Sequence, residues 1–125
     1  MNQIKNVIVL FVFLFSVISC AQQDPSKSYT MEQFKEKLKN DKELIVLDVR
    51  TPQELAGPLG AIVNAINIPV QELESRIAEL EKYKDKEIAV ICRTQNRSAV
   101  AADILRTNGY NVKYVLGGMT AFIQK

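Results

Sequence analysis

The chain has 125 residues, of which 47% are hydrophobic and 24% are charged, as is typical of one compact domain with a single core. Its 16 basic and 14 acidic residues leave a net charge of +2, which gives no basis for nucleic-acid binding. The chain contains no histidine, which excludes a histidine-ligated metal, an imidazole acid or base, and any Ser-His or Cys-His dyad.

The N-terminal segment has the layout of a secretion signal. Its apolar run, Val7 to Ile18, is shorter than the roughly 20 residues that a membrane-spanning helix needs. The stretch Val17-Ile18-Ser19-Cys20 resembles the lipobox of bacterial lipoproteins. The resemblance implies a signal peptide over residues 1–19, cleavage before Cys20 and lipidation of the Cys20 thiol, with palmitate among the acyl groups. The alternatives are an uncleaved anchor or an ordinary signal peptide cut slightly later.

The polar segment after the cysteine, Ala21 to Ser28, is interpreted as a tether between the lipid and the domain. We therefore expect a lipidated cysteine and tether over residues 20–28 and a folded domain over residues 29–125. The expected location is the bacterial cell envelope, with the protein held at a membrane by its N-terminal lipid and facing the periplasm. The sequence does not distinguish the inner from the outer membrane.

From Tyr29 onward, the hydrophobic pattern alternates between helix and strand. Thr30 and Gln33 form a capping-box signature, and apolar residues at helical spacing predict a helix that ends at Asn40. The continuous apolar run over 44–49 predicts a strand buried on both faces. The next predicted elements are a short helix opened by Thr51-Pro52 and ending at Leu55, a strand over 65–68 and a helix over roughly 71–83.

The second half of the chain continues the same alternation. It predicts a strand over 87–91, a helix over 98–107 ended by Asn108-Gly109, a strand over 112–116 and a final helical turn or two over 119–124. Strands that alternate with helices indicate a single α/β domain with a mostly parallel central sheet and helices on both faces.

Cys92 is the candidate nucleophile, because it follows the strand over 87–91 at the end where ligands bind in parallel sheets. The loop after it leads into a helix N-terminus, where free N–H groups and the helix dipole favour an anion. Arg93 and Arg97 add two cations, and all of these features favour the thiolate over the thiol. If Cys20 is acylated, Cys92 is left unpaired in a secreted protein, either as a buried apolar residue or as a reactive thiol.

Four stretches, in order along the chain, resemble the signatures of the rhodanese-like sulfurtransferases. They are LDVRTPQEL (Leu47–Leu55), GAIVNAINIP (Gly60–Pro69), CRTQNRS (Cys92–Ser98) and LGGMTAF (Leu116–Phe122). Together the matches cover nearly the whole domain. The stretches depart from the family pattern at Ala61, where histidine is usual, at Asn64, where glycine is usual, and at Gln95, where glycine is common.

The resemblance implies a sulfurtransferase that needs no metal and no organic cofactor. The Cys92 thiolate would attack the outer, sulfane sulfur of an anionic donor such as thiosulfate, which releases sulfite and leaves a persulfide on Cys92. A thiophilic acceptor would then take the sulfur: cyanide in an assay, a thiol in the cell, or a protein. The implied substrate-binding loop consists of Arg93, Thr94, Gln95, Asn96, Arg97 and Ser98.

Individual roles follow from the same resemblance. Arg97 and the loop N–H groups would stabilise the terminal sulfur anion, and Arg93 would attract the donor. Asp48 and Arg50 are interpreted as residues that organise the loop through a salt bridge or hydrogen bond, since a buried aspartate is costly unless it is paired. If the Gln95 position requires positive φ, glutamine there costs about 1 kcal/mol or more, whereas Asn64 tolerates left-handed geometry.

Other functions stay open on the sequence. A non-catalytic persulfide carrier or a membrane-tethered docking module would use the same domain and differ from an enzyme in turnover. A cysteine-based phosphatase or arsenate reductase is a more distant alternative, because its loop has five residues between cysteine and arginine and this chain has four. Thiol–disulfide exchange would need a second cysteine to resolve a mixed disulfide.

Overall fold

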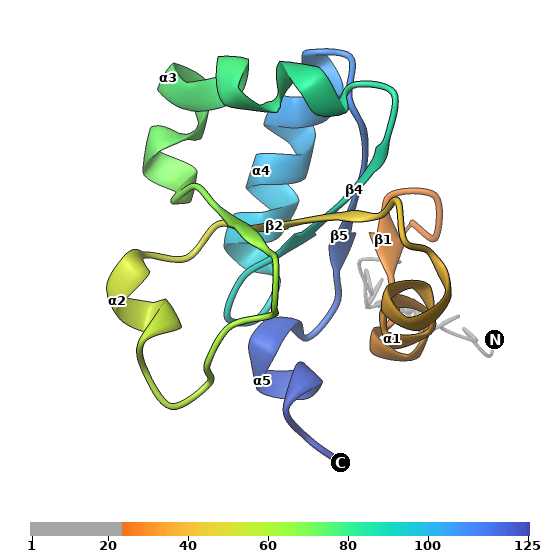
Figure 1. Ribbon diagram of the computed structural model, residues 1–125, viewed down its shortest axis with the longest axis vertical. Helices are drawn as coiled ribbons and strands as arrows, with labels where there is room; N and C mark the ends of the chain where they lie inside the picture. The colour runs from red at the N-terminus through yellow and green to blue at the C-terminus, as the bar shows by residue number, and fades with distance from the viewer. Residues whose placement is uncertain (1–23) are drawn as a thin grey trace, which may run out of the picture.

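The protein folds around one parallel sheet of five strands in the order β1-β5-β4-β2-β3 (Figure 1). Its structure, a computed structural model, describes residues 24–125. The strands are β1 (Ser28–Tyr29), β2 (Ile45–Asp48), β3 (Ile66–Asn67), β4 (Glu87–Ile91) and β5 (Asn111–Val115). All four pairings between neighbouring strands are parallel, which confirms the predicted α/β fold.

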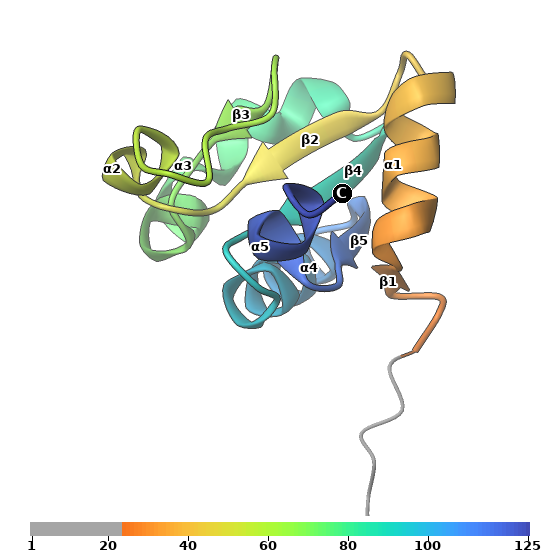
Figure 2. The same ribbon diagram turned by 90° about the horizontal axis from the view of Figure 1, so that it is seen from below.

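Helices cover both faces of the sheet (Figures 1 and 2). On one face lie α1 (Met31–Asn40) and α5 (Gly118–Phe122), and on the other lie α3 (Leu73–Arg76) and α4 (Asn96–Thr107). Two 3₁₀ helices, η1 (Val70–Glu72) and η2 (Ile77–Tyr83), flank α3, and the short α2 (Pro52–Leu55) follows the carboxyl end of β2.

The core consists of two layers that the alternation of each strand separates. In β4, Ile88 and Val90 face the layer under α3 and α4, whereas Ala89 and Ile91 face the layer under α1 and α5. Phe34 of α1 is completely buried in the second layer. Because both faces are buried, the strands have the nearly continuous apolar sequence of a parallel sheet.

Several elements agree closely with the sequence prediction. The helix α1 has the predicted bounds and capping box, in which Thr30 Oγ1 accepts from Gln33 N at 3.2 Å and Gln33 Oε1 accepts from Thr30 N at 3.0 Å. The strand β4 also has the predicted bounds. The helix α4 begins at Asn96, two residues before the predicted start at Ser98.

The predicted helix over 71–83 is mostly of a different kind. Only Leu73–Arg76 is α-helical, and Ile77–Tyr83 is a 3₁₀ helix. From Ile77 onward the apolar residues, Ile77, Leu80 and Tyr83, recur every third position, which matches the 3.0 residues per turn of a 3₁₀ helix. All three therefore pack against the same layer of the core.

The N-terminal predictions lie largely outside the described residues. The predicted signal peptide, Cys20 and the first part of the tether belong to residues 1–23. Within the tether, Ser28 is the first residue of β1, an edge strand that the sequence did not indicate. Among residues 24–125, no helix is long and apolar enough to cross a membrane.

Candidate active site

The Cys92 loop lies where β4 ends, between α4 and the start of α5. Cys92 follows Ile91, the last residue of β4, and α4 begins four residues later at Asn96. The N–H of Met119 in α5 donates to the carbonyl oxygen of Cys92 at 2.9 Å, and the N–H of Thr120 donates to that of Arg93 at 3.0 Å. The loop after β4 and the start of α5, which are far apart in the sequence, therefore meet at the carboxyl end of β4, where the sequence predicts the site.

The Cys92 side chain is buried against the first turn of α4. It is 1% exposed, and its Sγ lies 3.4 Å from both the backbone N and the Oγ of Ser98. Ser98 Oγ donates in turn to the carbonyl oxygen of Gln95 at 3.0 Å. The thiol thus ends a short hydrogen-bonded chain, and an N–H at the positive end of a helix points at its sulfur.

Two backbone N–H groups of the loop point away from α5 and are free to bind an anion. The carbonyl groups of Cys92 and Arg93 point to α5, and the peptide bonds in the described residues are all trans. In a trans peptide the N–H points opposite to the carbonyl, so the N–H groups of Arg93 and Thr94 point away from α5. Within residues 24–125 neither donates a hydrogen bond.

Gly118 lets α5 approach the loop this closely. Its φ is +53°, and a Cβ at this position would lie closer than 3.0 Å to the carbonyl oxygens of Cys92, Arg93 and Thr94. Both the left-handed backbone and the lack of space require glycine here. The sequence marked Gly117-Gly118 only as a turn and did not indicate its contact with the loop.

Gln95 is the position at which the sequence left a positive φ open. Its φ is −158° with a ψ of −12°, which lies outside the left-handed region, so glutamine carries no left-handed strain. It is the N-cap residue of α4, and its Oε1 accepts from the N–H of Gly117 at 3.1 Å. Asn64, by contrast, has a φ of 64°, the left-handed geometry that the sequence allowed for it.

Arg97 forms a two-point ion pair with Glu54 of α2. Its Nη1 and Nη2 lie 2.8 Å and 2.7 Å from the two carboxylate oxygens. Hydrogen bonds from Arg97 are the main reason that the pKa of Glu54 falls from 4.5 to about 2, and the carboxylate raises the pKa of Arg97. Glu54 was missed as a site residue, although its capping box with Thr51 could be read from the sequence.

Asp48 and Arg50 form the expected contact, but it lies beside the Cys92 loop and does not bond to it. Arg50 Nη2 lies 2.7 Å from Asp48 Oδ2 and also donates to the carbonyl oxygen of Gly60 at 2.8 Å. The pair is buried, and it fixes the turn between α2 and β3. Within residues 24–125 the buried Nη1 of Arg50 has no hydrogen-bond partner.

A cavity of about 610 Å³ lies beside the loop. Arg50 and Arg93 contribute its cations, and Pro58 and Leu59 contribute apolar surface. Its volume is within the usual range for small-molecule sites. The complete lining is Arg50, Gln53, Glu54, Gly57, Pro58, Leu59, Arg93 and Thr120. In the part of the chain that the structure describes, no group of three or more Cys, Asp or Glu side chains could hold a metal ion.

Comparisons with known proteins agree on one family. Residues 30–125 match the family described as Rhodanese-like domain. The Bacillus subtilis protein YqhL is 34% identical over 119 residues, which cover 91% of this chain and 89% of the relative. A protein named Sulfurtransferase from Allochromatium vinosum is 30% identical over 92 residues, which cover 73% of this chain and 82% of the relative. The crystal structure of a rhodanese-related protein from Thermoplasma volcanium has a TM-score of 0.69 at 41% identity, covering 78% of this chain and 90% of that chain.

Proposed function

Because this chain belongs to the rhodanese-like domain family, we propose that it is a sulfurtransferase that carries sulfane sulfur as a persulfide on Cys92. The observation that supports this most directly is the surroundings of the Cys92 sulfur. The Ser98 N–H points at Sγ, and the free N–H groups of Arg93 and Thr94 belong to the same loop. Such an arrangement stabilises a negatively charged sulfur.

The proposed reaction has two steps. In the first, the Cys92 thiolate attacks the outer sulfur of the donor, the bond between the two donor sulfurs breaks, and its electron pair leaves on sulfite when the donor is thiosulfate. In the second, a thiolate or cyanide attacks the outer sulfur of the persulfide, and the bond electrons return to Cys92. The products of the second step are a new persulfide or thiocyanate and the free Cys92 thiolate.

An anionic donor fits the charges around the loop. Glu54 offsets the charge of Arg97, and Asp48 offsets that of Arg50. Arg93 is therefore the cation left for the donor, and the buried Nη1 of Arg50 adds a hydrogen-bond donor without a protein partner in residues 24–125. Both residues line the cavity beside the loop. Because Cys92 is buried, the donor reaches Sγ after a movement of exposed loop residues such as Arg93 and Thr94. Thiosulfate is the proposed donor, and a low-molecular-weight or protein thiol is the proposed acceptor.

The N-terminal pattern supports a membrane location for this activity. We propose lipidation at Cys20 and a domain that faces the periplasm at the inner or outer membrane. The physical basis is the short apolar run that ends in a small residue and a cysteine. The partners are then a small anionic sulfur donor, a thiol, cyanide or protein acceptor, and the membrane itself through the lipid.

A persulfide carrier that does not turn over rapidly is the second candidate, and the burial of Cys92 favours it. A thiol that is 1% exposed protects a bound sulfane sulfur from solvent thiols but slows the entry of a donor.

A docking module without sulfur chemistry is a weaker alternative, because it gives no reason for the N–H groups around the sulfur. A phosphatase or arsenate reductase fits less well, since Glu54 already binds both terminal nitrogens of Arg97.

The test is the intact mass of the chain from Ala21 to Lys125 before and after incubation with thiosulfate. Residues 24–125 contain the complete sheet and both covering layers, so this chain retains the whole fold. We expect a gain of about 32 Da, the mass of one sulfur atom, that cyanide removes and that Cys92→Ser lacks. A gain only with a polysulfide would keep the persulfide and exclude thiosulfate as donor. No gain with either donor would overturn the sulfurtransferase proposal.

A further inference from the structure

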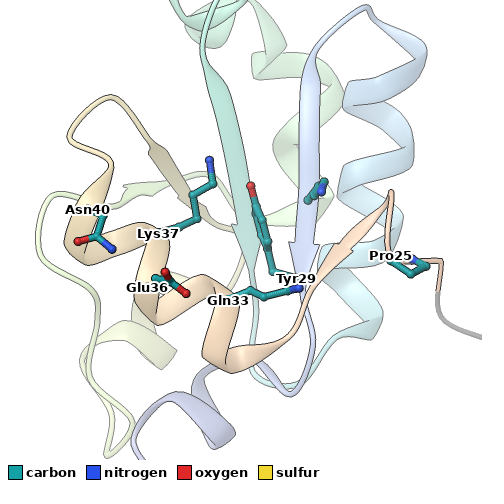
Figure 3. Close-up of a pocket in the computed structure, with 7 residues that line it drawn as sticks. Pro25, Tyr29, Gln33, Glu36, Lys37 and Asn40 are labelled. Atoms are coloured by element: carbon teal, nitrogen blue, oxygen red, sulfur yellow. The ribbon is translucent and has the colours of Figure 1, made fainter.

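A second cavity lies on the face of the sheet that α1 covers, beside the edge formed by β1 and β5 (Figure 3). We call it the Tyr29 pocket. Its volume is about 340 Å³, and its lining is Pro25, Tyr29, Gln33, Glu36, Lys37, Asn40 and Lys113. The pocket and Cys92 lie toward opposite ends of β4. Lys37 in the pocket wall contacts Glu87, the first residue of β4, whereas Cys92 follows the last residue of this strand. The two cavities have no lining residue in common.

The Tyr29 hydroxyl is buried in this pocket without a protein partner. The residue is 4% exposed, and within residues 24–125 its hydroxyl neither donates nor accepts a hydrogen bond. Figure 3 shows the Tyr29 ring beside α1 with the hydroxyl at its far end, in the direction in which Lys37 also extends from α1. A buried hydroxyl without a partner is unfavourable, so the pocket suits a ligand that can bond to it.

The cations around the pocket make an anion the best partner for this hydroxyl. Lys113 Nζ lies 5.1 Å from the centroid of the Tyr29 ring and has no ion-pair partner among the described residues. Lys37 is different, because it already pairs with Glu87 at 2.9 Å and with Asp41 at 3.4 Å. A cationic ligand would be repelled by both ammonium groups, whereas an anion gains one charged donor and one neutral donor.

The remaining groups limit the charge and size of that anion. The Glu36 carboxylate lies at the exposed rim, and Lys37 is already paired with Glu87 and Asp41. Among the described lining residues this leaves the charge of Lys113 for an anion, which suits a single negative charge better than two. The Oε1 of Gln33 is used in the capping box of α1, which leaves its NH₂ group as a further donor at the rim. The volume is at the low end of the range for ligand sites, which favours a small molecule.

We propose that the Tyr29 pocket binds a small monocarboxylate. The Tyr29 hydroxyl is covered in the pocket, so binding requires the long side chain of Lys37 or Lys113 to move aside. One carboxylate oxygen then accepts from the Tyr29 hydroxyl and the other from the Lys113 ammonium, and the rest of the ligand extends toward the amide groups of Gln33 and Asn40. Binding here is independent of the Cys92 chemistry. It gives the domain a second small-molecule site on the side of the sheet held by α1.

The test is an NMR titration of the chain from Ala21 to Lys125 with acetate and, separately, with phosphate at constant ionic strength. We expect saturable shifts at Tyr29, Gln33 and Lys113 with acetate, at about millimolar affinity for so small a probe, and weaker binding of phosphate. Tyr29→Phe and Lys113→Gln each weaken acetate binding about tenfold, because each removes a hydrogen bond to a charged group.

A matched control exists elsewhere on the surface. Lys82 Nζ lies 5.2 Å from the centroid of the Tyr83 ring, so Lys82→Gln removes the same kind of contact away from the pocket and leaves acetate affinity unchanged. Tyr29→Phe removes only a hydroxyl without a protein partner, so its urea midpoint should equal or exceed that of the parent chain. Absence of saturable shifts, or equal acetate affinity in all variants, would mean that the cavity holds only water. Tighter binding of phosphate than of acetate would overturn the monocarboxylate assignment.

Discussion

The sulfur of Cys92 has different hydrogen-bond partners available in each of its proposed states. As a thiol, it donates to Ser98 Oγ, which donates to the Gln95 carbonyl. As a thiolate, it keeps the N–H of Ser98 as a donor. In the proposed persulfide the negative charge would lie on an outer sulfur about 2.05 Å farther out, where the unused N–H groups of Arg93 and Thr94 are the available donors of the loop. Under the proposed function, Ser98 would therefore serve the thiol and thiolate, and the loop between Cys92 and Ser98 would serve the persulfide.

Glu54→Gln tests the ion pair that holds Arg97, and its effect on stability should depend on pH. The pKa of Glu54 in the fold is about 2, against an ordinary value of 4.5, so the charged form stabilises the fold above pH 4.5. This contribution is lost as the pH falls from 4.5 to 2. We expect the variant to be less stable by about 1 kcal/mol at pH 7, given partial exposure of the pair, and the difference to shrink through that window. Urea unfolding of both chains at pH 7, 4 and 2.5 measures it.

Glu79→Gln is the control for this experiment. Glu79 in η2 pairs with Arg76 at the end of α3, at 2.7 Å between Oε2 and Nε, and its side chain is 54% exposed. Exposed pairs of this kind contribute little, so the variant should match the parent chain at every pH. A Glu54→Gln difference that stays constant from pH 7 to pH 2.5 would show that the charge of Glu54 is not what stabilises the fold, since glutamine keeps the capping box.

At the scale of elements, the position of α5 determines the shape of the Cys92 loop, and Gly118→Ala tests this directly. The new Cβ would overlap three loop carbonyl oxygens, and alanine disfavours a φ of +53°. Overpacking and left-handed backbone together should cost about 3 kcal/mol or more. Urea unfolding measures the loss, and the persulfide yield of the folded fraction should fall because the two N–H donors to the loop carbonyls move away.

Gly109→Ala separates the cost of the left-handed backbone from the cost of overlap with the loop. Gly109 also has positive φ, +85°, but nothing lies within 4 Å of the position that its Cβ would occupy. This variant should lose only the backbone term of about 1–2 kcal/mol and keep its persulfide yield. Equal losses of stability and yield in both variants would mean that contact between α5 and the loop is not what shapes the loop.

Elements with strong local signals were predictable from the sequence. Thr30 and Gln33 determine the start of α1 through side chains three residues apart, and the buried run of β4 is bounded by charged and polar residues. The two-residue strand β1 is too short to show an alternating pattern. The η2 helix looked α-helical because one spacing of four, Leu73 to Ile77, precedes the spacings of three.

The candidate site was predictable only where it depends on residues that are close together in the sequence. Cys92 and its loop form one continuous stretch with a helix start after it, so local sequence was enough to single them out. The contact of Glu54 with Arg97 spans 43 positions, and that of Gln95 with Gly117 spans 22. Such contacts depend on which strands are neighbours, and a chain of alternating strands and helices leaves that order open. For the same reason, the negative φ of Gln95 could not be known before the position of α5.

At the scale of the whole molecule, β1 completes the sheet although the family match begins after it. Carbonyl groups of β1 and of the residue before it bind β5: the N–H of Tyr114 donates to the carbonyl of Lys27 at 3.1 Å, and that of Leu116 donates to the carbonyl of Tyr29 at 2.9 Å. The match to the rhodanese-like family covers residues 30–125 and so leaves β1 out. The N-terminal segment is therefore part of the folded unit from at least Lys27.

A chain that starts at Thr30 tests how much β1 contributes to the fold. It loses the burial of Tyr29 and two edge hydrogen bonds, which should lower the free energy of unfolding by about 2–3 kcal/mol relative to the chain from Ala21. It also exposes the edge of β5, and an open strand edge favours pairing between copies. Urea unfolding measures the first effect, and sedimentation velocity at increasing concentration measures the second. A chain from Ser26 keeps β1 and should behave as the longer chain does; if the chain from Thr30 matches both in stability and stays monomeric, β1 is dispensable.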